Sequence, residues 1–465
     1  MKKNRIETLL LVIYAAVLIT SVSICAPQRI FTDFVDINII FTVGKSLWKG
    51  LIVYRDLFEH KGPLMYAITA LAALVSKTSF LGVWIIEIIA AAAFLLISRK
   101  IIRRINPNAS LFLLPVIAFF IYRSEAFVGG TAEEFCLPLL AGALYIGVDA
   151  SLDSRMPSFK ESVLLGITSA AVFWIKYNMI GFYIGFLLIF VLFAWKDHAW
   201  KKLLTAAGGA VTGFLIVTLP ILVFFGINHA IDDLYQVYFY DNIHNYANRL
   251  DFLYQGYYTL TGTLSTVRAN LLCWGFIVLG IAELIFIRKN ARLVLFTLFA
   301  GGFTAWFVYC GGMKFNYYGF ILLVFAVFAA AFEPLPKNLQ KSAVPFAAAI
   351  VCTGILAGTG IRPADPERVR QMPQYVLAEQ IKEKDASLLT YDYFDAGFYL
   401  TSGLYPKEYH FTLTNCVIDQ ASEAQWNYIE EARPDYIVTM EDLSFAGAYE
   451  QIAQCEDWAL YKKKS

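Results

Sequence analysis

The chain has 465 residues, of which 58% are hydrophobic, 16% aromatic and only 16% charged. Soluble domains average about 45–50% apolar and about 25% charged residues, so the composition excludes an ordinary soluble protein and indicates a polytopic membrane protein. The formal net charge of +1 excludes the strongly basic field that favours nucleic acid. We therefore expect no nucleic-acid partner.

Apolar runs recur along the chain at lengths near the roughly 17–25 residues that cross a bilayer as a helix. Eleven such runs centre on residues 8–25, 80–98, 109–123, 135–150, 162–176, 179–195, 203–226, 270–287, 292–310, 317–332 and 343–361. A further run, Pro63 to Val75, is apolar but short. The predicted fold is therefore an all-α membrane protein with about eleven spans.

The placement of basic residues orients these spans, because cytoplasmic loops are enriched in lysine and arginine. If the 63–75 run lies flat as a juxtamembrane helix, the basic clusters all face the cytoplasm; they are Lys2/Lys3/Arg5, Arg99/Lys100/Arg103/Arg104, Arg155/Lys160, Lys196/Lys201/Lys202, Arg288/Lys289/Arg292 and Lys337/Lys341. The N-terminus is then inside the cell. Four larger segments, residues 26–79, 123–134, 227–269 and 362–465, lie outside.

The first outer loop carries two acids, Asp33 and Asp36, shortly after the first predicted span. A carboxylate at the mouth of a helix bundle can act as a general base for an acceptor hydroxyl, provided that polar neighbours hold it near an electrophile. The alternative is a solvated loop carboxylate without a catalytic role.

The same loop continues with a motif of charged and aromatic residues that ends in Lys-Gly-Pro-Leu at residues 61–64. It resembles a stretch of the membrane glycosyltransferases of the GT-C type, in particular protein O-mannosyltransferases and the aminoarabinose and galacturonic acid transferases of lipid A. The family pattern is Gly-x-x-Pro-Tyr-x-Asp-x-Phe-Glu-x-Lys-x-Pro-Leu, and the residues that fit it here are Gly50, Tyr54, Arg55, Asp56, Phe58, Glu59, Lys61, Pro63 and Leu64. Val53 replaces the proline.

The resemblance implies catalytic residues. Counted back from Gly50, Asp36 is the better match to the family's catalytic aspartate and Asp33 the second. A later acidic pair, Glu133 and Glu134, falls where the family has an acidic motif that positions or polarises the acceptor. Without the family, this pair is equally explained by the dipole at the start of the following helix, which favours acids in its first turn.

The resemblance also implies the reaction. Such enzymes take a sugar from a polyprenyl-phosphate donor at the outer face of the cytoplasmic membrane. They transfer it to a lipid, glycan or protein of the envelope, with inversion at the anomeric carbon. The leaving phosphate needs cations nearby, and the candidates are Lys61, Lys176 and Lys314. Snorkelling to the membrane interface is the alternative for Lys176 and Lys314.

The outer loop around residues 231–253 is rich in tyrosine. Aromatic rings there suit sugar stacking, although an interfacial aromatic belt also explains them. Related enzymes place a phosphate-binding base in this loop, and His244, with Arg249 as the alternative, stands at that place. Glu59 together with a histidine is a candidate for binding a divalent metal ion; no other cofactor is indicated.

After Ile361 the composition becomes polar, so we expect a membrane module over residues 1–361 and a small soluble α/β domain over 362–465. Predicted strands and helices alternate there with crossover connections. The strands are 387–391, 409–412, 436–439 and 458–461, and the helices are 395–402, 421–431 and 443–454. No glycine-rich phosphate loop follows a strand, which disfavours nucleotide binding.

Two other functions fit a protein with many spans. A transporter or flippase of an envelope precursor would concentrate charges at mid-span, whereas the charges here gather in the outer loops. A ligase or polymerase that moves a preassembled glycan would use the same outer site with a different donor.

Every site assignment depends on the orientation, which predicts that residues 26–79 and 362–465 are both extracytoplasmic. A cysteine introduced at Ser402 should react with an impermeant thiol reagent in intact cells, and one at Ser158 should not. The reverse labelling pattern would show that the topology is inverted.

Overall fold

The structure, a computed structural model, describes residues 2–246, 251–340, 342–416, 419–444 and 446–464. The chain folds into two compact units that do not follow chain order. Unit one contains residues 1–23, 86–220 and 249–361, and unit two contains residues 24–85, 221–248 and 362–465. The predicted boundary after Ile361 coincides with a change of unit, while an independent domain over 362–465 stays a prediction.

Unit one consists of long apolar helices, because its sequence offers runs of Leu, Ile, Phe and Ala with few breakers. The helices are α1 Lys2–Val22, α4 Leu81–Ile105, α5 Leu113–Tyr122, α6 Ala132–Leu152, α7 Phe159–Ile175, α8 Gly181–Lys196, α9 Trp200–Ile227, α11 Phe252–Ala269, α12 Leu271–Ala282, α13 Ala291–Tyr309 and α15 Val344–Gly358. Shorter or wound pieces join them: η3 Tyr177–Ile180, η5 Glu283–Ile287, the 3₁₀ helix η6 Asn316–Ala331 and α14 Lys337–Gln340. Helices α4 and α9 each extend by a few residues into unit two.

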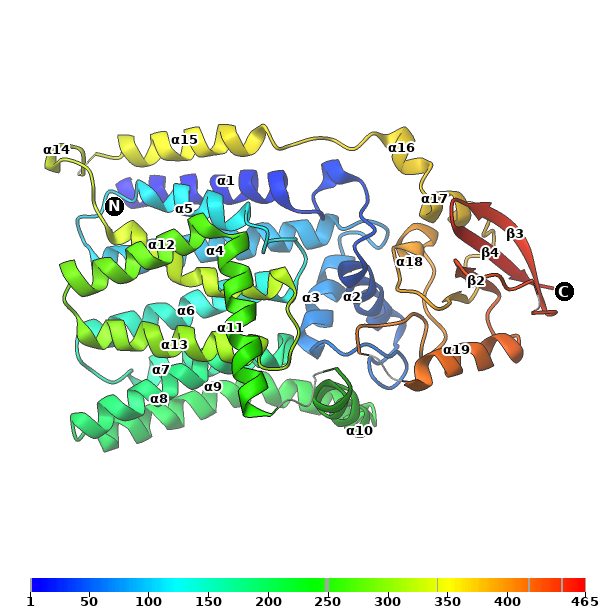
Figure 1. The fold of residues 1–465 in the computed structure, drawn as a ribbon, viewed down its shortest axis with the longest axis horizontal. Coiled ribbons are helices and arrows are strands. Elements are labelled where there is room, and N and C mark those ends of the chain that lie inside the picture. The colour runs from blue at the N-terminus through cyan, green and yellow to red at the C-terminus, as the bar shows by residue number, and fades with distance from the viewer. Residues whose placement is uncertain (1, 247–250, 341, 417–418, 445, 465) are drawn as a thin grey trace. The chain divides into compact units, whose positions relative to one another are not determined.

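Each of the eleven runs predicted to span the membrane forms a helix in the part of the chain that the structure describes. Six helices there are individually long and apolar enough to cross a bilayer: Asn4–Arg29, Leu81–Ile105, Ala132–Leu152, Tyr177–Lys196, Trp200–Ile227 and Ala291–Tyr309. Helix α12 continues from α11 with a bend of 106°, and Figure 1 shows α11 lying across the neighbouring helices of this unit. The multi-pass membrane character is thus confirmed.

Helices of unit one approach one another closely at glycines, as is common between membrane helices. A Cβ added to Gly213 of α9 would lie 1.9 Å from the carbonyl oxygen of Val163 in α7, and one added to Gly166 would lie 2.0 Å from that of Ala210. These contacts leave no room for a side chain. Helices α7 and α9 are therefore packed backbone to backbone.

Unit two begins with the first predicted outer loop, which folds into two helices, α2 Val35–Ser46 and α3 Pro63–Ala73, beside the short turns η1 Pro27–Arg29 and η2 Leu47–Lys49. Pro63 begins α3 at the position where a missing N–H costs nothing. At about 1.5 Å per residue, this helix of 11 residues is far shorter than a bilayer core. The short helix predicted for this run is confirmed, while its place beside the membrane stays a prediction.

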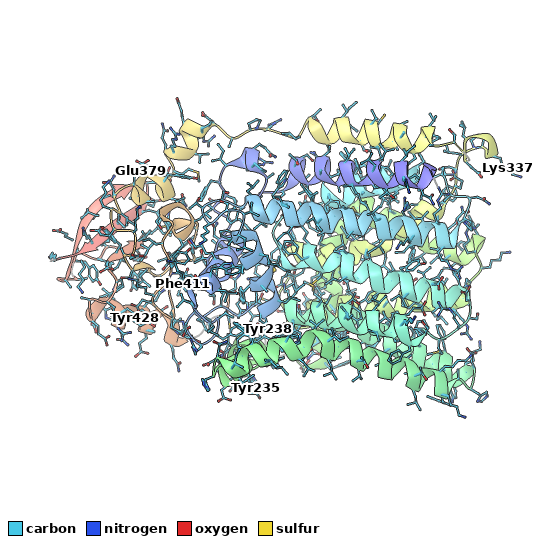
Figure 2. All side chains as sticks on the ribbon, turned by 180° about the vertical axis from the view of Figure 1, so that it is seen from behind. Tyr235, Tyr238, Lys337, Glu379, Phe411 and Tyr428 are labelled. Atoms are coloured by element: carbon cyan, nitrogen blue, oxygen red, sulfur yellow. The ribbon has the colours of Figure 1, made fainter. Side chains whose placement is uncertain are left out.

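The rest of unit two comprises α10 Ile231–Asp233, the π-helix η4 Leu234–Tyr246 and the C-terminal elements α16 Pro366–Arg370, α17 Pro373–Ala378, α18 Phe398–Ser402, α19 Asp419–Glu430, β1 Leu388–Thr390, β2 Tyr436–Thr439, β3 Tyr449–Cys455 and β4 Trp458–Lys463. The strands form one sheet in the order β1-β2-β4-β3. β1 and β2 are parallel, and the other pairs are antiparallel. Tyr428 of α19, labelled in Figure 2, packs in the core beneath the sheet.

Two elements of the C-terminal prediction are wrong. Residues 409–412 form no strand: the His410 carbonyl accepts from the Gln425 side chain and not from a neighbouring strand. The segment 443–454 is not a helix: its second half is β3, which forms a hairpin with β4. In β3 only Tyr449 is buried, and the other side chains are exposed or half-buried without regular alternation. The segment therefore lacks the alternating pattern by which a strand is recognised in a sequence.

Candidate active site

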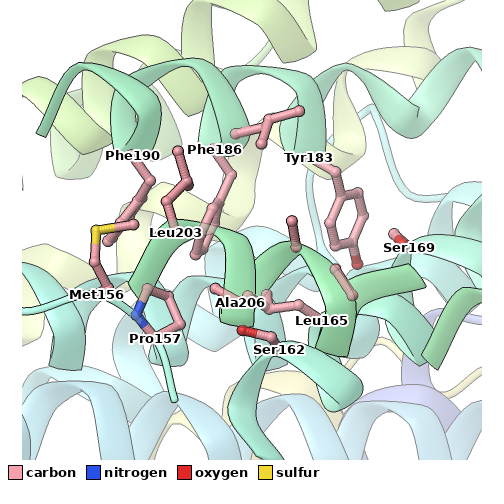
Figure 3. A pocket seen from close by; sticks show the side chains of 13 residues that line it. Met156, Pro157, Ser162, Leu165, Ser169, Tyr183, Phe186, Phe190, Leu203 and Ala206 are labelled. Atoms are coloured by element: carbon pink, nitrogen blue, oxygen red, sulfur yellow. The ribbon is translucent and has the colours of Figure 1, made fainter. Parts of the chain in front are cut away.

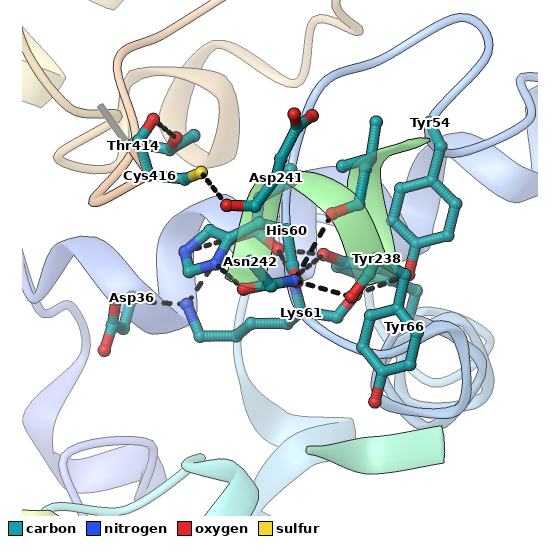
Figure 4. Close-up of polar contacts among 12 residues, drawn as sticks. Asp36, Tyr54, His60, Lys61, Tyr66, Tyr238, Asp241, Asn242, Thr414 and Cys416 are labelled. Atoms are coloured by element: carbon teal, nitrogen blue, oxygen red, sulfur yellow. Dashed lines mark hydrogen bonds and ion pairs between the residues drawn. The ribbon is translucent and has the colours of Figure 1, made fainter. Parts of the chain in front are cut away.

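The first-loop motif builds a buried ion cluster in unit two. Lys61 Nζ lies 3.3 Å from Asp36 Oδ1 and 3.4 Å from Glu59 Oε1, as Figure 4 shows for the Asp36 contact. The side chains of Lys61, Asp36 and Glu59 are 12%, 9% and 1% exposed. A lysine thus bridges the aspartate predicted to be catalytic and the glutamate of the motif.

Helices α2 and α3 bring these residues together. Asp36 lies in the first turn of α2, where the helix dipole favours a carboxylate, and Lys61 lies two residues before α3. The Thr69 hydroxyl donates to the Ile40 carbonyl of α2 at 3.1 Å. A Cβ on Gly44 would meet Thr69 Oγ1 at 2.1 Å, so only glycine permits this close contact.

Two tyrosines hold the motif in place. The Tyr66 hydroxyl donates to Glu59 and accepts from the Lys61 backbone N–H at 3.0 Å. The Tyr54 hydroxyl donates to the Lys61 carbonyl at 2.5 Å. Both rings are fully buried, and the tyrosines therefore orient the backbone on either side of the Lys61 ammonium.

Arg55 and Asp56 stabilise the turn that precedes the cluster. Asp56 Oδ2 accepts from the Ile52 N–H at 2.7 Å. Arg55 forms an ion pair with Asp56 at 2.8 Å and donates to the Asn228 carbonyl at 2.7 Å. Among the described residues, neither side chain forms a hydrogen bond or ion pair with Lys61. The geometry therefore assigns these two motif residues a structural role in the turn.

His60 joins the cluster from the other side. Asn242 of η4 donates to the carbonyls of His60 and Tyr238, at 2.7 Å and 3.0 Å, so its Oδ1 accepts the proton of His60 Nδ1 at 3.0 Å. His60 Nε2 lies 3.6 Å from Glu59 Oε1 and has no hydrogen bond among the described residues.

The electrostatics of the cluster favour a charged lysine and a neutral histidine. Burial lowers the pKa of Lys61, but the Asp36 and Glu59 carboxylates outweigh it and raise the pKa well above its ordinary value. Burial also lowers the pKa of His60, and the Lys61 charge adds to this effect, while Glu59 opposes it. The cluster consequently places a charged lysine between two acids, with a neutral histidine beside it.

Metal binding gains no support from this geometry. Among the residues that the structure describes, no three His, Cys, Asp or Glu side chains gather as a metal site would require. The cation next to Glu59 is instead Lys61.

In unit one, Lys176 donates to Glu133 Oε1 at 2.6 Å, and its ammonium lies 3.7 Å from the centre of the Tyr318 ring. Glu133 lies in the first turn of α6, and Lys176 ends α7. The glutamate is buried and the lysine is 14% exposed. These two predicted site residues therefore form a pair of their own.

Glu134, beside Glu133 in sequence, points into a different environment. The Gly130 N–H donates to Glu134 Oε2 at 3.0 Å and to Glu87 Oε1 at 2.7 Å, and the Ser23 hydroxyl donates to Glu87. Two buried carboxyl groups this close cannot both be ionised without strong repulsion. The surroundings of Glu134 thus suit a structural hydrogen-bond cluster in unit one.

The remaining predicted residues lie apart from these clusters. Asp33 is exposed before α2. His244 stacks on Tyr240, with ring centres 4.2 Å apart, and contacts the Tyr240 carbonyl at 2.9 Å. Lys314 lies over the rings of Tyr257 and Tyr258 in unit one, at 5.2 Å and 4.5 Å. Arg249 lies outside the described residues.

Comparison with known proteins gives a consistent picture. Residues 60–224, less than half of the chain, match the family model of dolichyl-phosphate-mannose-protein mannosyltransferase. No curated protein sequence matches the chain. Two crystal structures of ArnT from Cupriavidus metallidurans share its fold: the undecaprenyl phosphate complex has a TM-score of 0.64, 11% identity and 97% coverage of both chains. The apo state has a TM-score of 0.63 and 12% identity, and covers 99% of this chain and 98% of that one.

The family match and the shared fold agree with the resemblance carried by residues 50–64. Residues 60–224 therefore resemble membrane mannosyltransferases, and the chain as a whole has the fold of ArnT. At 11–12% identity the ArnT structures establish the fold alone, so the role of each residue here is argued from its own geometry.

The sequence did not single out several residues that hold the candidate site in place. On α2, Thr42 donates to Asp395 Oδ2 at 3.0 Å and Lys45 donates to the Tyr399 carbonyl at 2.6 Å. Burial lowers the pKa of Lys45 to about 8, although Asp395 opposes the shift. Asn38, Thr42 and Lys45 are spaced four and three residues apart and therefore share one face of α2. A polar face on a helix in an apolar segment was the sequence signal that could have revealed them.

The ion cluster predicts a specific stability defect. Replacing Lys61 by Met leaves two buried carboxylates without their cation, and breaking such a buried pair typically costs about 3–5 kcal/mol of folding stability. The double variant Lys61→Met/Glu59→Gln removes one of the two charges and should recover part of the loss. Thermal unfolding of the purified protein measures both, and equal stability of Lys61→Met and wild type would contradict the cluster.

Proposed function

We propose that this protein is a membrane glycosyltransferase of the GT-C type that moves a sugar from a polyprenyl-phosphate donor to a lipid, glycan or protein of the envelope, with Asp36 as general base. The observation that carries the proposal is the Asp36–Lys61–Glu59 cluster, which combines a carboxylate and a permanent cation at a nearly buried position. The undecaprenyl phosphate in the similar ArnT structure supports the class of donor.

In the proposed step, the acceptor oxygen attacks the anomeric carbon of the sugar. Asp36 takes the acceptor proton, the new C–O bond forms, and the bond from the anomeric carbon to the phosphate oxygen breaks. Polyprenyl phosphate leaves as an anion with the bonding electrons. Because attack and departure occur on opposite faces, the sugar product is inverted.

Lys61 connects the two halves of this reaction. Its ammonium now neutralises Asp36, and a carboxylate paired in this way is a weak base. A donor phosphate near Lys61 would draw the ammonium away, because a phosphate offers more negative charge than one carboxylate. Asp36 then regains its basicity when the donor is bound, while Lys61 stabilises the leaving anion.

The remaining predicted residues keep supporting parts in this proposal. We assign Glu133 to acceptor positioning, held by its 2.6 Å contact with Lys176, and Glu134 to the buried carboxyl cluster beside it. Lys176, Lys314, His244 and Arg249 stay candidates for contacts with the donor phosphate, and Asp33 for a secondary acid. The reaction is proposed on the outer face of the cytoplasmic membrane, with the N-terminus inside and residues 362–465 outside.

The general-base assignment predicts that Asp36→Asn loses transfer activity by a factor of ~10²–10⁴, the typical contribution of a positioned base. Asp33→Asn, at an exposed acid of the same loop, is the matched control and should have a milder effect. Transfer from a lipid-linked sugar to a crude envelope acceptor measures both. Undiminished transfer by folded Asp36→Asn would rule out Asp36 as the base.

The donor assignment predicts that Lys61→Ala weakens use of the lipid-linked donor. Loss of a charge-assisted hydrogen bond costs about 1.5–3 kcal/mol, which is roughly ten- to a hundredfold at ~1.4 kcal/mol per decade. Lys61→Arg keeps the charge and should retain part of the activity. Donor titration per folded molecule gives the answer, and an unchanged donor requirement in Lys61→Ala would refute the phosphate contact.

Purified protein reconstituted in liposomes and supplied with a lipid-linked sugar separates an enzyme from a transporter or flippase. Glycosyl transfer releases free polyprenyl phosphate, whereas a transporter moves its solute or lipid and leaves the donor intact. Solute movement without sugar transfer under any lipid-linked donor would reject the proposal.

A further inference from the structure

A separate cavity of about 210 Å³ lies among α7, α8 and α9 of unit one, shown in Figure 3. Its lining is almost wholly apolar and includes Met156, Leu165, Phe186, Phe190 and Leu203. Ligand pockets typically measure about 300–1,000 Å³, so this cavity suits a slender chain and not a compact ring system.

The cavity exists because, beyond Leu203, α9 turns three alanines toward this place. Ala206, Ala207 and Ala210 face it, while Gly166 and Gly213 hold α7 and α9 in backbone contact nearby. Protein interiors are normally filled to crystal-like density. An unfilled apolar space between membrane helices is therefore available to a hydrocarbon chain.

The cavity is open toward the apolar surface of these helices. Leu187, one of its lining residues, is 54% exposed, and Leu204 on α9 is 71% exposed. Exposed leucines on membrane-spanning helices contact lipid. A lipid tail can therefore enter the cavity directly from the bilayer.

Two of the lining residues, Ser162 and Tyr183, have a buried hydroxyl without a hydrogen-bond partner among the described residues. Ser162 is 1% exposed, and its Oγ forms no hydrogen bond among the described residues. Ser162 lies in the first turn of α7, near the membrane surface and not at mid-span. A hydroxyl at this depth suits the ester carbonyl of a glycerolipid.

A basic rim lies next to the cavity in sequence and structure. Lys160 lies two residues before Ser162, and Lys201 and Lys202 lie just before Leu203. All three lysines are exposed, and none of them forms an ion pair in the described part of the chain. The acids of this end, Asp149, Asp153 and Glu161, are already bound by Arg104 and Arg155. The three lysines therefore offer uncompensated positive charge.

We propose that this cavity and its lysines bind an anionic glycerophospholipid. One acyl chain occupies the apolar cavity, the Ser162 hydroxyl donates to the ester carbonyl, and the lysines pair with the headgroup phosphate. Exposed Trp200 and Phe159 at the same helix ends mark the interface where such a headgroup lies. The site is independent of the sugar-transfer chemistry.

The test is native mass spectrometry of the full-length protein with added dioleoyl-phosphatidylglycerol or dioleoyl-phosphatidylcholine. Wild type should retain the anionic lipid in preference. Lys201→Ala/Lys202→Ala should lower its affinity about 30-fold, which is ~2 kcal/mol from two lysines at ~1 kcal/mol each. The matched control Lys100→Ala/Lys337→Ala removes the same charge from other exposed lysines and should bind as wild type does.

A cavity variant tests the tail separately. Ala206→Leu fills the apolar space without altering charge and should weaken binding of both lipids. Equal retention of the two lipids by wild type, equal loss in the two lysine variants, or unchanged binding by folded Ala206→Leu would each overturn the site. With polyprenyl phosphate as a third added lipid, weaker retention of it by Lys201→Ala/Lys202→Ala together with unchanged retention of phosphatidylglycerol would overturn the assignment to a phospholipid.

Discussion

The contact on which the site depends is that of one lysine with two buried acids. Lys61 lies 3.3 Å from Asp36 and 3.4 Å from Glu59, and without it two carboxylates would share a nearly dry space at high cost. The lysine therefore fixes the relative position of α2 and the loop before α3. The same charge is what a leaving phosphate requires, so the residue that stabilises the resting site is also suited to the reaction.

Around this contact, unit two surrounds the motif with hydrogen bonds from segments far apart in the chain. Asn242 of η4 binds the His60 backbone, the Phe58 N–H donates to the Tyr409 carbonyl at 2.9 Å, and Asp395 accepts from Thr42 of α2. A loop of this length would be mobile alone. The C-terminal segment thus contributes directly to the rigidity of the residues around Asp36.

Strong local patterns were predictable, and context-dependent ones were not. The apolar runs that became helices, and the short α3, follow from composition and length, because a helix satisfies its own backbone in a bilayer. The segment 443–454 failed because strand β3 exists only through its pairing with β4. His60 escaped notice because it occupies a variable position of the motif, and its importance comes from Asn242, which is 182 residues away.

The sequence by itself determined that this is a polytopic membrane protein, and its first-loop motif indicated a resemblance to glycosyltransferases of the GT-C type, with Asp36, Glu59 and Lys61 as residues of interest. Composition and a short charged motif suffice for that, since both are local properties. Only the tertiary structure decided that Lys61 bridges the two acids, that Glu133 pairs with Lys176 while Glu134 does not, and that His60 contacts Asn242. Those outcomes depend on distances of a few ångströms between segments, and such distances are set by packing and burial rather than by order along the chain.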